Sequence, residues 1–205
     1  MKIPSSSIPR ISIYYRTLLS LPEQGIVSSE EISSLTGCNA AQIRKDLAYF
    51  GQFGKRGQGY SVNTLTRELK KILGIGKNWN VALVGAGNLG SALLAYKGFY
   101  KQGFNIKKVF DNDKNKIGKS QQGAKVIDIK NLKRVLKSDK IDMVIVAVPH
   151  DAAQGIINDV ISVGVRAVLN FAPIVPKTPK WVEVLNIDLS IELEQLAYFL
   201  QKDKL

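Results

Sequence analysis

The spacing of apolar residues changes near residue 75 of the chain. Before that point, apolar residues recur every three or four positions, as on the buried face of a helix. After it, short β-branched runs alternate with helical stretches, as in a sheet of parallel strands joined by crossover helices. The segment 74–78, GIGKN, contains two glycines and is the expected linker. The pattern therefore predicts one domain over 1–76, a second over 79–188 and a terminal helix within 189–205.

Two helices are expected in the first 36 residues. One spans 11–21 and ends before Pro22. The other follows Ser28, and Glu31 three residues later completes a capping-box pattern. The residues expected to face inward are Ile11, Tyr15, Leu18 and Leu19 in the first helix, and Ile32 and Leu35 in the second.

A third helix, over 40–50, follows a tight turn at 36–39 (TGCN) in which Asn39 is the expected cap. Two helices joined by a short glycine-containing turn are typical of a helix-turn-helix. Small and basic side chains opposite the apolar stripe would let the helix approach DNA and contact phosphates or guanine; a solvated helix face is the alternative. The buried stripe is expected to be Ile43, Leu47 and Phe50, and the DNA contacts Gln42, Arg44, Lys45 and Tyr49.

The segment 51–60, GQFGKRGQGY, predicts a β-hairpin with Lys55 and Arg56 at its tip. Such a tip can enter a minor groove, where cations meet a strong negative potential. A closing helix over 64–73 is expected after a cap at Asn63. The first domain is thus predicted to be a winged helix that binds DNA, and a winged helix used only for protein contacts is the alternative. The closing helix is expected to turn Leu65, Leu69 and Ile72 inward.

A glycine motif opens the second domain. The apolar strand 81–84 runs directly into Gly85-x-Gly87-x-x-Gly90, and a helix is expected from Asn88 to Gln102. The glycines permit a tight turn, a close approach of the backbone to a pyrophosphate, and close packing of helix on strand. This spacing predicts a dinucleotide site.

The next strand, over 106–110, ends in Asp111, 21 residues after Gly90. A carboxylate there accepts hydrogen bonds from a ribose and repels a 2′-phosphate, which favours NAD(H) over NADP(H). The alternative is an aspartate that merely ends a strand.

The remaining pattern predicts a Rossmann-type, doubly wound parallel sheet. Ligands bind at the carboxyl ends of its strands, which places Pro149 and the NFAP segment (170–173) beside the nicotinamide. Ser190 is the expected cap of the last helix, whose apolar stripe packs on its own sheet or on another subunit. Further strands are expected over 125–127, 141–148, 167–170 and 182–187, and helices over 131–136, 151–163 and 191–202.

Composition narrows the function classes. Apolar residues make up 45% of the chain, but the longest apolar run, 143–148, is far shorter than the roughly 20 residues of a membrane span. The 29 basic and 17 acidic residues give a net charge of +12, which favours a polyanion as partner. With a single cysteine (Cys38) and a single histidine (His150), neither an intrachain disulfide nor a metal site is expected, and a cytoplasmic location fits.

Taken together, these motifs resemble the family of bacterial redox-sensing transcriptional repressors called Rex. The resemblance spans essentially the whole chain and is carried by AAQIRKDLAYFGQFGKRGQGY (40–60), VGAGNLGSALLAY (84–96), FDNDKNKIG (110–118), AVPHDAAQ (147–154) and NFAP (170–173). It implies a homodimer that exchanges its C-terminal helix, binds an inverted-repeat operator, and is released when NADH rather than NAD⁺ binds.

The resemblance also implies particular residues. The switch would bring Arg16, Tyr96 and Asp188 together across the dimer. The NADH or NAD⁺ contacts would be Gly85, Ala86, Gly87, Asn88, Leu89, Gly90, Tyr96, Asp111, Ile117, Gly118, Val148, Pro149, Asn170, Phe171, Ala172 and Pro173.

Three other functions fit parts of the sequence. A dinucleotide-dependent dehydrogenase would use His150, but no second acid–base partner is evident and residues 174–205 are too few for a substrate domain. A thiol sensor would use Cys38, although no resolving cysteine is present. A CoA-binding module shares this fold, but CoA carries a 3′-phosphate near the ribose edge where Asp111 is expected.

Overall fold

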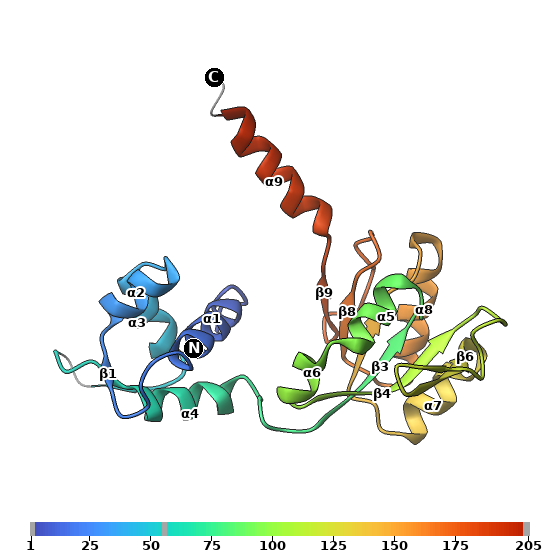
Figure 1. Ribbon diagram of the computed structural model, residues 1–205, viewed down its shortest axis with the longest axis horizontal. Coiled ribbons are helices and arrows are strands. Elements are labelled where there is room, and N and C mark those ends of the chain that lie inside the picture. The colour runs from blue at the N-terminus through green and yellow to red at the C-terminus, as the bar shows by residue number, and fades with distance from the viewer. Residues whose placement is uncertain (1–2, 55–56, 203–205) are drawn as a thin grey trace. The chain divides into compact units, whose positions relative to one another are not determined.

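The computed structural model describes residues 3–54 and 57–202. The chain divides between Lys77 and Asn78 into two compact units. Each unit has its own apolar core, and Figure 1 follows the chain through both.

The first unit is mainly helical. Its core joins the helices through Ile11, Tyr14, Ile32, Ile43 and Leu65, all fully buried. Ser28 and Asn39 cap the second and third helices as predicted, and the capping box of Ser28 and Glu31 is complete. The elements are α1 (Ser7–Leu18), β1 (Ile26–Val27), α2 (Ser29–Thr36), α3 (Ala40–Ala48), β2 (Tyr60–Ser61) and α4 (Val62–Ile72).

Three sequence predictions for this unit are wrong in detail. The first helix ends at Leu18, so Leu19 lies beyond it and is exposed. Leu35 is also exposed, because α2 turns only Ile32 deeply into the core. Asn63 is not the cap of α4: the Ser61 hydroxyl accepts the Thr64 N–H, since β2 runs directly into the helix.

The structure adds a strand pair that the predicted hairpin over 51–60 did not include. β2 pairs antiparallel with β1, the strand preceding α2, with Val27 opposite Tyr60, and Gly54 lies close to Gly59 and Tyr60. Gly51, Gly57 and Gly59 all adopt positive φ, which interrupts extended backbone along this loop. The predicted tip residues, Lys55 and Arg56, lie outside the described residues.

The second unit is built on a sheet with the order β5-β6-β4-β3-β7-β8-β9. All neighbouring strands are parallel except β5, which pairs antiparallel with β6 and is absent from the prediction. The six parallel strands have the 3-2-1-4-5-6 order of the Rossmann fold, which confirms the predicted fold class. The strands are β3 (Trp79–Val84), β4 (Phe104–Asp111), β5 (Ser120–Gln121), β6 (Ala124–Asp128), β7 (Met143–Val146), β8 (Ala167–Asn170) and β9 (Glu183–Asn186).

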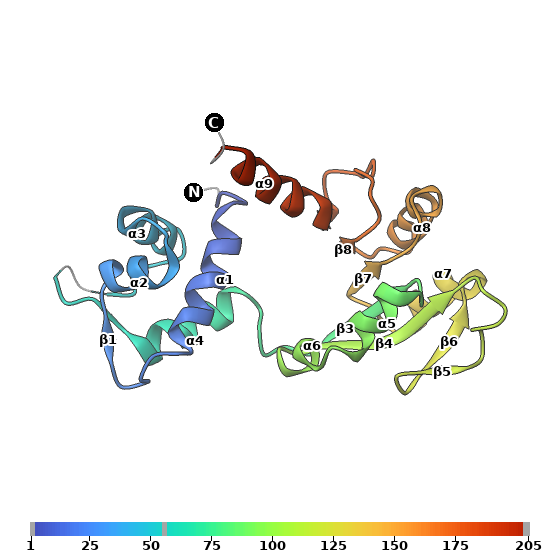
Figure 2. The ribbon, with the colours of Figure 1, turned by 45° about the horizontal axis from the view of Figure 1, so that its top comes forward.

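Alternate residues of β3 pack on opposite faces of this sheet. Ala82 and Val84 contact the cluster that includes α7 and α8, whereas Val81 and Leu83 contact the cluster that includes α5. Figure 2 shows these helices around the sheet. The helical elements are α5 (Asn88–Ala95), α6 (Lys97–Lys101), the 3-10 turn η1 (Ile129–Asn131), α7 (Leu132–Ser138) and α8 (His150–Ser162).

The helix predicted over 88–102 is broken at Tyr96, whose ψ of 100° is extended rather than helical. The exposed Tyr96 ring folds back over the position of Gly98. The sequence around Tyr96 contains no proline that would mark this break.

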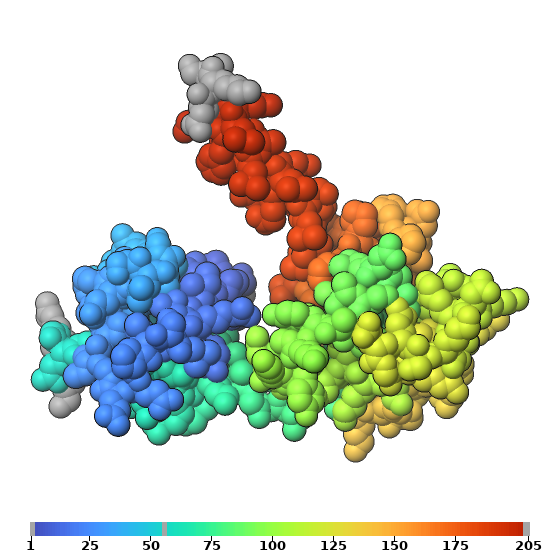
Figure 3. Space-filling view, viewed as in Figure 1, coloured from blue at the N-terminus to red at the C-terminus, as the bar shows by residue number. Residues whose placement is uncertain are grey.

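The last helix, α9 (Leu189–Lys202), has no buried residue within the described chain. Figure 1 shows it following β9, and its atoms, red in Figure 3, are largely uncovered. The alternative in which α9 packs on its own sheet is therefore wrong. The predicted Ser190 cap is also wrong, because Asp188 is the capping residue: its carboxylate accepts the Ser190 N–H at 2.9 Å. Its exposed apolar side chains are Leu189, Ile191, Leu193, Leu196, Tyr198, Phe199 and Leu200.

Across the described residues, no helix has the length and apolar character that a membrane crossing requires.

Candidate nucleotide-binding and DNA-binding sites

The glycine loop connects β3 to α5 at the point where the strand order reverses. Gly85 has a φ of 100°, donates its N–H to the Phe110 carbonyl at 2.8 Å, and lies too close to the Ala147 carbonyl for a side chain. Gly90 is pressed against the Gly85 carbonyl in the same way, whereas the space beside Gly87 is open. The outer glycines thus hold strand and helix in close contact, and the loop exposes its backbone at Gly87, as a pyrophosphate requires.

Asp111 ends β4 directly beside this loop and is only 7% exposed. Its carboxylate accepts the N–H of Ala86 at 2.8 Å, the N–H of Asp113 at 2.8 Å and the ammonium of Lys116 at 3.2 Å. Burial raises the pKa of Asp111, but these donors outweigh it and hold the pKa below its ordinary value. An ionised acceptor therefore lies at the edge where the sequence predicts a ribose.

Gln121 is a residue of this site that sequence reasoning missed. Its side-chain amide donates to the Ala86 carbonyl at 3.3 Å and to the Ser91 hydroxyl of α5. The short antiparallel pair of β5 and β6 carries it there, across a separation of 35 residues from Ala86. Because Asp111 holds the N–H of Ala86 and Gln121 holds its carbonyl, this residue of the glycine loop is fixed on both sides.

A cavity of about 240 Å³ lies at the carboxyl ends of β3 and β4. Asp111 is the charged residue of its largely apolar wall. The predicted contacts Gly87, Asn88, Leu89, Gly118, Pro149 and Pro173 are exposed, Ile117, Val148 and Phe171 are half-buried, and Ala86 and Ala172 are buried. The residues lining the cavity are Val84, Gly85, Asp111, Asn112, Ile129, Ala152 and Ile156.

Asn170, another predicted contact, is fully buried and hydrogen-bonded within the fold. Its amide nitrogen donates to the carbonyls of Ala172 at 3.0 Å and Ile174 at 3.2 Å, and to the Asn186 side chain at 2.9 Å. Its oxygen accepts the Ala172 N–H at 3.0 Å. The side chain therefore shapes the turn that follows β8 and ties it to β9.

The three predicted switch residues are all exposed. Tyr96 stacks edge to face on Phe99 with ring centroids 5.0 Å apart, and Asp188 accepts the N–H of Ser190. Arg16 belongs to the last turn of α1 in the first unit, while Tyr96 and Asp188 belong to the second. Their meeting across a dimer stays a prediction.

The exposed side of α3 carries two small and two basic residues. Ala41, Arg44, Lys45 and Ala48 share this side, and Ile43 and Leu47 on the opposite side are buried, as predicted. The other two DNA contacts that were predicted on the third helix are less accessible: Tyr49 is half-buried, and the Gln42 amide donates to Asp46 at 2.9 Å.

Asp46, which sequence reasoning missed, is fully buried between α3 and α1. Its carboxylate accepts hydrogen bonds from Ser7 at 2.9 Å, from Arg10 at 2.6 and 2.8 Å, from Tyr14 at 3.0 Å and from Gln42. Burial raises the pKa of Asp46, but these donors lower it to about 2. This network fixes the position of α3 on α1.

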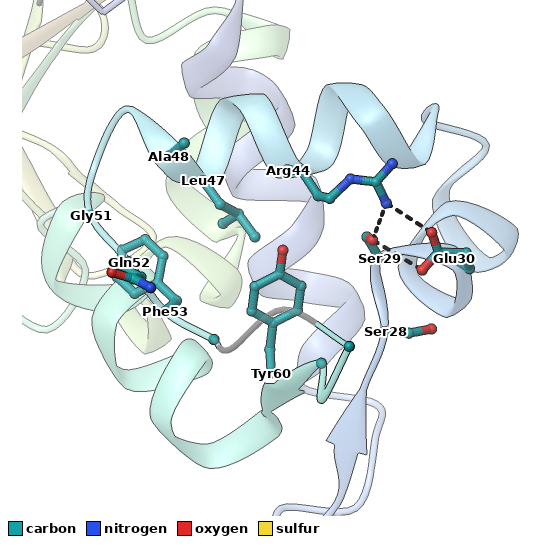
Figure 4. A pocket seen from close by; sticks show the side chains of 13 residues that line it. Ser28, Ser29, Glu30, Arg44, Leu47, Ala48, Gly51, Gln52, Phe53 and Tyr60 are labelled. Carbon is teal, nitrogen blue, oxygen red and sulfur yellow. Dashed lines mark hydrogen bonds and ion pairs between the residues drawn. The ribbon is translucent and has the colours of Figure 1, made fainter.

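A groove of about 650 Å³ separates α3 from the glycine-rich loop. Figure 4 shows it from close by, with Arg44 on one wall extended toward the beginning of α2. One guanidinium nitrogen of Arg44, Nη1, donates hydrogen bonds to the Ser29 hydroxyl at 2.6 Å and to the Glu30 carboxylate at 2.8 Å. The described residues that line this wing groove are Ser28, Ser29, Glu30, Arg44, Leu47, Ala48, Gly51, Gln52, Phe53, Gly54, Gly57, Gly59 and Tyr60.

A helix-turn-helix unit joined to a Rossmann-type sheet with a nucleotide-binding glycine loop defines the class of nucleotide-responsive transcriptional regulators. Residues 2–48 match a family model described as putative DNA-binding protein N-terminus, and residues 76–174 match one described as CoA binding domain. Over 200 residues the chain is 50% identical to the redox-sensing transcriptional repressor Rex of Desulforamulus reducens and 48% identical to that of Desulfitobacterium hafniense. Both alignments cover 97% of this chain and 95% of the relative. The chain belongs to the Rex family of redox-sensing transcriptional repressors, as its motifs predicted.

Solved structures agree with this assignment over the full length. RSP in complex with β-NAD⁺ and operator DNA matches with a TM-score of 0.93 and 36% identity, covering 100% of this chain and 95% of that one. RSP in complex with β-NADH matches with a TM-score of 0.89 and 35% identity, covering 100% and 97%. A further structure of RSP is described as a Rex-family repressor.

Proposed function

We propose that this protein is a homodimeric repressor that holds an inverted-repeat operator with its first unit and releases it when NADH occupies its second unit. NAD⁺ permits DNA binding. The observation that carries the proposal is the contact between the ionised Asp111 and the glycine loop at Ala86, because it forms a ribose acceptor beside a pyrophosphate site. The related RSP was crystallised with NAD⁺ and operator DNA together, and separately with NADH.

The residues present fit a dinucleotide. The open space beside Gly87 leaves room for a pyrophosphate, and the cavity beside Asp111 offers apolar walls. Asp111 orients the ribose and disfavours a 2′-phosphate, which also argues against CoA. Val148, Pro149 and the turn 171–173 would face the nicotinamide half, with Ile117 and Gly118 completing the site. Asn170 acts indirectly, by holding that turn.

The dimer is proposed from α9. A helix with seven exposed large apolar residues is covered in a stable protein, and the covering surface in our proposal is a second copy of this chain. Exchange of this helix would bring Asp188 near Arg16 of the partner. An ion pair between them, rearranged through Tyr96, would connect the nicotinamide site to the DNA-binding unit.

DNA contacts are proposed for Arg44 and Lys45 on α3, for Gln42 and Tyr49 beside them, and for Lys55 and Arg56 in the loop. Each lost phosphate contact lowers the salt dependence of binding by about one ion. Because the curated relatives are named as repressors, we propose that the protein has no catalytic activity. We also propose a cytoplasmic location.

The test is binding of fluorescent duplexes that carry candidate inverted repeats, in separate titrations with NAD⁺, NADH, NADPH and CoA. We expect NADH to release the duplex at far lower concentration than the other three ligands. A protein that binds no duplex preferentially, or that responds equally to NAD⁺ and NADH, would refute the proposal.

A further inference from the structure

Arg44 is held at one edge only. Its Nη1 contacts both Ser29 and Glu30, and the Ser29 hydroxyl donates to the other Glu30 oxygen at 3.0 Å. Among the described residues, Nε and Nη2 of Arg44 have no hydrogen-bond partner. The guanidinium is therefore anchored to α2 through Nη1, as Figure 4 shows, while its second edge, Nε and Nη2, has no such contact.

The anchor is an ionised carboxylate on the exposed surface. Its own backbone N–H, Arg44 and Ser29 all donate to Glu30, which lowers the pKa of Glu30. Both charged side chains stay more than half exposed, at 52% for Arg44 and 68% for Glu30, so the pair adds little to the stability of the fold. A negative charge beside a DNA-binding arginine also repels phosphates, so it weakens binding to every duplex alike.

An anchored arginine nevertheless gains in selectivity. A guanidinium presents donors in a fixed fork that fits the two acceptors of guanine, O6 and N7, in the major groove. A free arginine chain loses rotamer freedom when it adopts that geometry, whereas one already fixed at Nη1 loses less. Two neighbours of Arg44 on α3, Ala41 and Ala48, are small and permit close approach to the groove.

Resting on the proposed function, we infer that Glu30, assisted by Ser29, is a specificity-determining residue that aims the free edge of Arg44 at a guanine of the operator. Glu30 acts through Arg44 and is a positioning residue. It lowers affinity for DNA in general and raises discrimination between the operator and other sequences.

The test compares an operator duplex, selected by the wild-type protein from randomised DNA, with a random duplex of the same length. Glu30→Gln is expected to bind random DNA at least as tightly as wild type, while the ratio of operator to random affinity falls about threefold. Glu30→Asp keeps the charge but shortens the side chain, and we expect the same fall. Glu23→Gln removes an exposed carboxylate elsewhere in the unit and should leave the ratio unchanged.

Two further measurements assign the effect to Arg44. Replacing each operator guanine in turn by 7-deazaguanine should identify one position at which wild type loses binding and Glu30→Gln does not. In an Arg44→Ala background, Glu30→Gln should cause no further loss of discrimination.

Three results would each overturn the inference. The ratio of operator to random affinity could stay unchanged in Glu30→Gln, or it could keep its wild-type value in Glu30→Asp. Glu30→Gln could also lower this ratio as much in the Arg44→Ala background as it does in the wild type. A wild-type protein that selects no duplex would overturn the proposed function together with it.

Discussion

Replacing Asp46 by asparagine is expected to destabilise the packing of α3 on α1. The variant keeps the shape of the side chain but removes the charge that receives five hydrogen bonds from Ser7, Arg10, Tyr14 and Gln42. Removing one partner of a buried ion pair costs about 3–5 kcal/mol. Arg10 keeps 26% of its side chain exposed, so water relieves part of this cost and we expect about 3 kcal/mol.

Hydrogen exchange of the α3 amides in the full chain measures this loss where it occurs. A loss of about 3 kcal/mol should accelerate exchange through local opening about 100-fold. Glu23→Gln serves as the matched control, because it removes an exposed carboxylate of the same unit and should change stability by less than about 0.5 kcal/mol. If exchange in Asp46→Asn stays within threefold of wild type, the network does not hold α3 in place.

The same residue predicts an acid dependence. The pKa of Asp46 is about 2 in the folded protein against an ordinary value of 3.8. Because the pKa of Asp46 is lower in the folded than in the unfolded protein, its ionisation adds about 2 kcal/mol to the free energy of unfolding above pH 3.8. This stabilisation is lost as the pH falls toward 2. Glu30, Glu31 and Glu68 also have lowered pKa values, so wild type and Asp46→Asn must be compared at each pH. The difference between their free energies of unfolding should shrink as the pH falls from 3.8 toward 2.

Three further predictions concern the second unit. Asp111→Ala should weaken NADH binding about 10- to 100-fold and improve NADPH relative to NADH, measured by calorimetry, since hydrogen bonds to charged groups contribute about 1.5–3 kcal/mol; unchanged discrimination would remove Asp111 from the site. Gln121→Ala should weaken NADH binding about fivefold, because it frees the Ala86 carbonyl, whereas the control Ser120→Ala on the same strand should leave NADH binding unchanged. If Gln121→Ala binds NADH as tightly as wild type, the role of Gln121 is refuted. Leu196→Glu on α9 should yield monomers by light scattering, while Glu194→Gln should not; a persistent dimer in Leu196→Glu would place the interface elsewhere.

The glycine-loop site was predictable because its chemistry is local. Strand, glycines and helix follow one another directly, and Asp111 comes at a spacing set by a single crossover. Gln121 was not predictable, because a two-residue strand brings it to the loop and nothing in its neighbours marks that contact. The break at Tyr96 likewise has no sign in the helical pattern of the sequence.

Asp46 is different, since the sequence does contain a sign of its burial. It lies between Ile43 and Leu47 on the apolar stripe of α3, and a carboxylate at such a position is rarely buried without a partner. Its partners, Ser7, Arg10 and Tyr14, follow helical spacing on α1. The pairing of β2 with β1 has no such sign: the glycines of 51–60 indicate turns, but they do not indicate that the strand before α2 pairs with β2.

Under the proposed function, the path from the nicotinamide end of the site to α9 runs through Asn170. Its side chain holds the turn 171–173 through Ala172, its amide contacts Asn186, and its carbonyl accepts the N–H of Ile187 at 2.8 Å. Asp188 and α9 follow directly. NADH and NAD⁺ differ mainly in the charge of the nicotinamide ring, and a sensor responds only if the two forms favour different states of the protein. Under the proposed function, any rearrangement of the turn 171–173 changes the hydrogen bonds that fix the end of β9. The helix α9, which has no buried residue within the described chain, is thus attached directly to that end.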